Sequence, residues 1–117
     1  MAVEWKKVFI RGKIQTAASA SSITPDCDDY EIVEHSNAEG AGTLTVNAPT
    51  GTPVNFQQLK MKIKSTNAQT FNWNEIYEDT TDITKPASIG AGKEIELLFE
   101  YHTSATKWRC IALTNIV

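Results

Sequence analysis

The sequence has few of the features that mark most enzymes, membrane proteins and nucleic-acid-binding proteins. It contains two cysteines, no Cys-x-x-Cys pair and no Cys/His cluster at zinc-like spacing. The 11 Lys and Arg residues are outnumbered by 14 Asp and Glu, so no basic face for nucleic acid or an anionic membrane surface is expected. No stretch approaches the roughly 18–20 apolar residues of a membrane span.

The N-terminal segment lacks a secretion signal. Its apolar run covers residues 8–10, far short of the roughly 7–15 residues of a signal-peptide core. We therefore expect a soluble protein that is made in the cytoplasm and leaves it by a route other than secretion.

The two cysteines, Cys27 and Cys110, leave two interpretations open. They could form one bridge, but two free and partly buried thiols are favoured for a protein assembled in the cytosol. The chain has 117 residues, enough for one core and no more. It needs neither a disulfide nor a metal to fold.

Two segments show the alternation of apolar and polar side chains that is typical of half-buried strands. Residues 59–64 alternate between apolar and lysine side chains, and residues 94–101 alternate between apolar side chains and glutamates, apart from Leu98. Because their outward faces carry opposite charge, we predict that the two strands are neighbours in one sheet. The alternative is that each face is solvated separately.

Weaker patterns predict further strands. Residues 107–113 follow the second strong strand after a short polar link, which indicates an antiparallel hairpin. Residues 71–73 are expected to pair back on residues 60–64 across residues 65–69. The other expected strands are residues 5–10, 30–35 and 43–47.

Glycine and proline turns separate these segments, and no long helix is indicated. The pattern predicts an all-β protein, a single antiparallel β-sandwich of about seven to eight short strands with an N-terminal arm. The expected division is an arm and flexible linker at residues 1–22 and a β-sandwich domain at residues 23–117.

The N-terminal arm carries the apolar residues Trp5, Val8, Phe9 and Ile10, followed by a linker of small residues at 17–22. An arm of this kind must bury its apolar face. It either completes its own sandwich as an edge strand or docks on a neighbouring subunit or capsid protein.

The search for reactive chemistry yields no site. Asp26 and Asp28 have calcium-loop spacing, but the glycine and glutamate that an EF-hand requires are missing. His35, Cys27 and Asp28 carry no nucleophile signature around them. We expect no catalytic residue, no cofactor and no metal, so the chain is predicted not to be an enzyme.

Aromatic residues offer a second kind of site, because aromatic faces stack on sugars. Most of Trp73, Tyr77, Tyr101 and Trp108 fall at inward-facing positions, which favours core packing over a sugar platform. Phe56 and Tyr77 lie beside loops and are the expected exposed aromatics, and therefore the candidates for surface recognition.

Residues 21–113, about four-fifths of the chain, resemble a small domain of bacteriophage virion proteins that often ends tail fibres. The resemblance is carried by the order and spacing of several loose motifs: Ser22-Ile23-Thr24-Pro25, Asp29-Tyr30-Glu31-Ile32, residues 48–53, Gln58-Leu59, Ile63-Lys64, Trp73-Asn74-Glu75-Ile76-Tyr77, Ala91-Gly92-Lys93, Tyr101 and Lys107-Trp108. The family usually has an Asp-Gly turn before the Gln-Leu strand. This chain has Asn55-Phe56-Gln57 there, a departure that would expose Phe56.

The resemblance implies a non-enzymatic structural protein located in the virion and assembled in the host cytoplasm. A nearly free-standing copy behind a short arm suits a capsid decoration (cement) or head-fibre protein. Its partners would be other virion proteins, major capsid or tail proteins, and a homotrimer is the expected oligomer. The alternative is a tail-fibre or tail-tip module that recognises host surface glycans.

Overall fold

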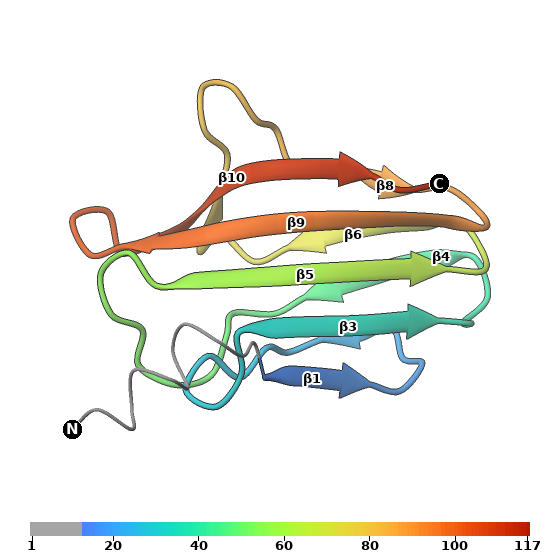
Figure 1. Cartoon of the computed structure of the whole chain (residues 1–117). Helices are drawn as coiled ribbons and strands as arrows, with labels where there is room; N and C mark the ends of the chain where they lie inside the picture. The colour runs from blue at the N-terminus through green and yellow to red at the C-terminus, as the bar shows by residue number, and fades with distance from the viewer. Residues whose placement is uncertain (1–12) are drawn as a thin grey trace.

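A computed structural model describes residues 13–117, which form ten strands and no helix (Figure 1). Six strands form one sheet in the order β1-β3-β5-β9-β10-β7, and four form a second in the order β2-β4-β6-β8. The strands are β1 (Ile14–Ala17), β2 (Ser22–Ile23), β3 (Ile32–Asn37), β4 (Gly42–Val46), β5 (Gln58–Ser65), β6 (Gln69–Trp73), β7 (Tyr77–Glu78), β8 (Ser88–Ile89), β9 (Lys93–His102) and β10 (Lys107–Asn115).

The first six strands wind as a solenoid. They alternate between the sheets along the chain, so that β1, β3 and β5 stack in parallel in one sheet and β2, β4 and β6 stack in parallel in the other. The prediction of an all-β protein is therefore confirmed, but the single antiparallel sandwich of seven to eight strands is wrong. Alternation of side chains specifies which face of a strand is buried; it does not specify the strand's partner or direction.

Parallel winding places equivalent links at the same end of the molecule. The links from the six-stranded to the four-stranded sheet are short, at residues 18–21, 38–41 and 66–68, whereas the first two links back, at residues 24–31 and 47–57, are longer. We call the opposite end, which also holds the β6–β7 and β9–β10 connections, the long-link end. It consists of residues 24–31, 47–57, 74–76 and 103–106.

The predicted contact between the two strong strands is confirmed. β5 and β9 pair antiparallel, with Met61 opposite Leu97 and both side chains buried between the sheets. Outside, Lys60 Nζ lies 2.8 Å from Glu96 Oε1, and Lys62 Nζ lies 3.7 Å from Glu94 Oε2. The ion pairs are partly exposed, so the main contribution of these strands to stability is the apolar area they bury.

The hairpin between β9 and β10 is also confirmed, with a register shift between Cys110 and Ala112 that leaves Ile111 unpaired as a β-bulge. The expected pairing of residues 71–73 with residues 60–64 is wrong. β6 lies in the other sheet, beside β4 and β8. Residues 66–68 therefore turn a corner of the solenoid, anchored by the bond from Thr66 N to Asn37 O at 2.8 Å.

The N-terminal boundary also differs from expectation. β1 pairs with β3 and β2 pairs with β4, so a boundary after residue 22 falls inside β2. Within the expected linker, Ser19 Oγ donates to Glu39 Oε2 at 2.9 Å and accepts from Ala38 N at 2.8 Å. The arm residues Trp5, Val8, Phe9 and Ile10, and the strand expected at residues 5–10, lie outside the described residues.

Candidate functional site

The long-link end contains the largest group of described residues that lie outside the strands. Its first two links are joined by a bridge between Asp26 and Thr50, and Cys27 N donates to Thr50 O at 3.0 Å. Asp28 Oδ1 accepts from Thr52 N at 2.9 Å. Gly51 has a φ of 101°, and a Cβ there would meet the Asp28 carboxyl carbon at 2.6 Å, so both the backbone angle and the close approach require glycine.

The turn at residues 54–57 is held by bonds to β9, by a bond to Cys27 and by a bond within the turn itself. Phe56 N donates to Tyr101 O at 2.7 Å, and Tyr101 N donates to Gln57 O at 2.8 Å. The Gln57 amide joins two links, since Nε2 donates to Cys27 O at 2.7 Å and Oε1 accepts from Val54 N at 3.0 Å. Residues far apart in the sequence therefore fix one turn.

This turn presents two apolar side chains to solvent. Val54 is 64% exposed and Phe56 is 63% exposed, as expected for Phe56. The rings of Phe56 and His102 form a T-shaped contact, with ring centroids 5.4 Å apart. Phe56 also has a φ of 67°, a left-handed conformation that costs a bulky residue on the order of 1 kcal/mol. The fold thus holds an exposed aromatic ring in a strained and well-bonded position.

The second expected surface aromatic, Tyr77, is not at the surface, and that prediction is wrong. Tyr77 is 3% exposed, with its ring centroid 5.0 Å from that of Phe99. The Tyr77 hydroxyl donates to Asn47 O at 2.8 Å, and burial raises the pKa of Tyr77 above its ordinary value. The strand β7 turns this side chain inward to pair beside Trp108. Core packing, the favoured interpretation of the aromatic residues, holds for Tyr77 and Trp108.

The residues considered for catalysis do not form a reactive group. His35 is 1% exposed between the sheets, and burial lowers its pKa. Cys27 is buried, and burial followed by the charge of Asp28 raises the pKa of its thiol, which keeps it protonated and weakly nucleophilic. Both Cys27 and Cys110 are free thiols. Among residues 13–117 there is no group of three or more His, Cys, Asp and Glu placed to hold a metal ion.

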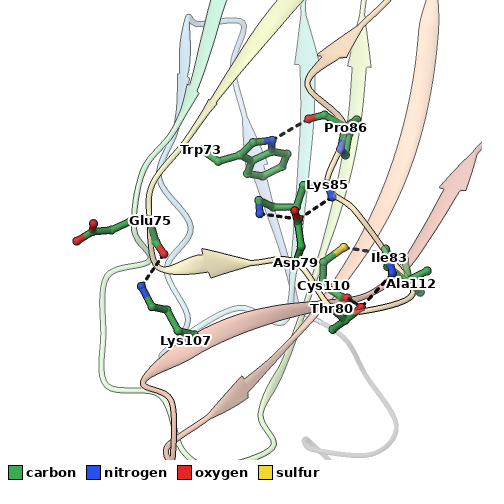
Figure 2. Close-up of polar contacts among 10 residues, drawn as sticks. All are labelled: Trp73, Glu75, Asp79, Thr80, Ile83, Lys85, Pro86, Lys107, Cys110 and Ala112. Carbon is green, nitrogen blue, oxygen red and sulfur yellow. Dashed lines mark hydrogen bonds and ion pairs between the residues drawn. The ribbon is translucent and has the colours of Figure 1, made fainter.

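The loop at residues 79–87 projects from the body of the protein, and Figure 2 shows the contacts that hold it. Asp79 Oδ1 accepts from both Lys85 Nζ and Lys85 N, at 2.7 and 2.8 Å, and these bonds lower the pKa of Asp79. Thr80 Oγ1 donates to Cys110 O at 3.0 Å, and Trp73 Nε1 donates to Pro86 O at 2.9 Å. These contacts fasten the loop to both sheets.

A shallow depression of about 200 Å³ lies on the outer face of the six-stranded sheet, beside the β-bulge. Its lining combines the Lys60–Glu96 ion pair with the side chains of Leu98, Ala112 and Thr114 and the main chain of Leu97. Sequence reasoning missed this depression because the register shift at Ile111 has no signature in the sequence. Its two charged groups already neutralise each other, which leaves the long-link end as the stronger candidate.

Residues 13–117 include no helix that is long and apolar enough to cross a bilayer. No protein-family model matches the chain, and no curated protein matches it. Among solved structures, it is similar to a chain described as "Structure of a chaperone-substrate complex", with a TM-score of 0.52 and 16% identity over 87% of the present chain. The present chain spans 18% of that chain's length, and the likeness concerns the fold alone.

Proposed function

We propose that this chain is a non-enzymatic structural protein of a bacteriophage particle, a capsid decoration or head-fibre protein that docks on the particle surface. The observation that carries the proposal is the rigid turn that exposes Val54 and Phe56 at the long-link end. A strained, exposed aromatic residue that lies at the centre of a bonded turn is a feature of binding surfaces, because folding alone does not favour it.

Two further observations support a docking role over chemistry. The buried side chains of both sheets pack into one core cluster between them, an arrangement that suits a structural role. In solenoid folds, the longer connections gather on one face, and that face is often the one that binds. In this chain that face is the long-link end. The arm residues Trp5, Val8, Phe9 and Ile10 are proposed as the second docking element.

The alternative is a tail-fibre module that recognises host surface glycans, and the exposed ring of Phe56 is the observation in its favour. The polar side chains beside the ring count against it. Asn55 Oδ1 is occupied by Thr103 N at 3.1 Å, and the Gln57 amide is occupied at both of its atoms. Part of the hydrogen-bonding capacity of these two amides is therefore already used within the protein, which leaves less of it for sugar hydroxyls.

Immunogold electron microscopy tests the proposal. Antibody raised against the purified chain is applied to intact phage particles released from the strain that carries its gene, with particles from a strain deleted for that gene as the control. Label on the heads is expected. Label on the tail tip would support the alternative, and particles without label would contradict both.

A further inference from the structure

The surface at Val54 and Phe56 is preorganised for an apolar partner. The two side chains are 64% and 63% exposed, yet their turn is held in place by main-chain bonds to β9 and by the bond from the Gln57 amide to Cys27 O. A partner would bury apolar area on this turn without ordering it first, which favours association.

The links around this apolar pair carry net negative charge, and two lysines border them: Lys13, which lies over the Tyr30 ring, and Lys107, whose Nζ donates to Glu75 O at 2.8 Å. The links of the long-link end contain five acidic residues and no Lys or Arg, the acids being Asp26, Asp28, Asp29, Glu31 and Glu75. Asp28, Asp29 and Glu75 are exposed. The partner that fits this surface therefore combines apolar side chains with positive charge.

The chain itself contains a segment of that chemistry. Residues 1–12 carry Lys6, Lys7 and Arg11 against one acid, Glu4, and these charges are interleaved with the apolar arm residues Trp5, Val8, Phe9 and Ile10. The segment joins the fold at the long-link end, where Lys13 N bonds Glu31 Oε2 at 2.6 Å and Lys13 Nζ lies over the Tyr30 ring. Twelve extended residues span about 40 Å, more than the two shorter dimensions of the molecule, 29 and 23 Å, so the segment is long enough to reach past its own subunit to a neighbouring copy.

We propose that residues 5–11 of one copy dock on the long-link end of a second copy, with apolar arm side chains on Val54 and Phe56 and Lys6, Lys7 and Arg11 facing the acidic links. This inference rests on the proposed function, an assembling particle component, and gives that function its subunit contact. The contact joins two different surfaces of the chain, so it is heterologous and closes into a ring when the rotation between copies permits. A trimer is one such ring.

Sedimentation velocity of the full chain over a range of concentrations tests this contact. We expect a concentration-dependent oligomer whose dissociation constant rises at least about tenfold in Phe56→Ser and in Val54→Ser, because each removes an apolar contact. Ile111→Ser, which removes an exposed apolar residue on the outer face of the sheet, is the matched control and should leave the constant unchanged.

A charge exchange makes the test specific to the arm. Lys6→Glu with Lys7→Glu, or Asp29→Lys with Glu75→Lys, should each weaken association by about tenfold or more, and the four changes together should restore it to within about threefold. Asp82→Lys with Glu39→Lys makes the same change in net charge outside the long-link end and should have no such effect.

Three results would overturn the inference: a wild-type chain that stays monomeric at every concentration, an oligomer indifferent to both apolar changes, or a charge exchange that fails to restore association. None of these would remove gold label from phage heads. Failure of the subunit contact is therefore distinguishable from failure of the proposed function.

Discussion

The hydroxyl of Tyr77 donates a hydrogen bond of 2.8 Å to the main-chain oxygen of Asn47, and this bond joins β7 to the link that leaves β4. The tyrosine is 3% exposed, so water does not readily replace the bond. The bond thus connects the chain after β6 to the link between β4 and β5. The bond is therefore a direct probe of how tightly the long-link end is attached to the core.

Removing this hydroxyl should destabilise the protein without enlarging the core. We expect Tyr77→Phe to lower the free energy of unfolding by about 1–2 kcal/mol, because the Asn47 oxygen loses its buried partner. Urea titration followed by circular dichroism measures the change. Tyr30→Phe, at a partly exposed tyrosine, is the control and should stay within about 0.5 kcal/mol of the wild type. Equal effects of the two changes would contradict the structure.

Sequence reasoning predicted those parts of the fold that depend on the faces of single strands. The alternation in residues 59–64 and 94–101 gave the buried faces, and opposite outward charge gave the pairing of β5 with β9. The departure from the Asp-Gly turn at residues 55–57 correctly predicted that Phe56 is exposed.

The solenoid winding could not be predicted from the alternation of side chains. Whether strands stack in parallel depends on how each link crosses from one sheet to the other. The link at residues 66–68 is as short as a hairpin loop and yet turns a corner. Tyr77 was misplaced for a similar reason. It follows a turn closed by the bond from Tyr77 N to Asn74 O at 3.0 Å, and only the pairing of β7 with β10 directs its side chain inward.

His35 should make the stability of the protein depend on pH. Both ring nitrogens are buried, and no described residue offers either of them a hydrogen bond of normal geometry. Burial lowers the pKa of His35 below its ordinary value of 6.5, and the backbone of Ala20 offsets part of this shift. The unfolded chain therefore binds more protons than the folded one once the pH falls below about 6.5, and stability falls with it.

We expect the free energy of unfolding to drop by about 1–2 kcal/mol between pH 7 and pH 5 because of His35. In His35→Leu that drop should disappear, while stability at pH 7 is unchanged or higher, since two unpaired polar atoms leave the core. Val33→Ala, at the neighbouring buried position of β3, removes no titratable group and should keep the wild-type pH profile at a lower stability. A His35→Leu profile that still falls below pH 6.5 would assign the dependence to another group.

The two cysteines should behave as protected thiols. Cys27 and Cys110 are buried and unbridged, and burial raises the pKa of each thiol. We expect a disulfide-exchange dye such as DTNB to react with the folded protein at least about a hundredfold more slowly than with the unfolded protein, because reaction requires local opening. Two thiols should be counted in denaturant, and reducing agent should leave the melting temperature unchanged. An intact mass two hydrogens lighter would reveal a bridge.

The left-handed backbone at Phe56 predicts an unusual order of stability among its variants. At most positions alanine is more stable than glycine, because glycine loses more conformational freedom on folding. At a φ of 67° the order reverses, and we expect Phe56→Gly to be more stable than Phe56→Ala by about 1 kcal/mol. Val54, two residues away, is equally exposed, and its φ is not positive. Val54→Ala should therefore be more stable than Val54→Gly.

Thermal and urea unfolding of the four variants measure both orders in one experiment. If alanine is the more stable at both positions, Phe56 is not held in the left-handed conformation. If Phe56→Gly is at least as stable as the wild type and yet fails to associate, the ring contributes to binding and not to folding. Its strained position would then be a cost in stability retained for the contact it makes with a partner.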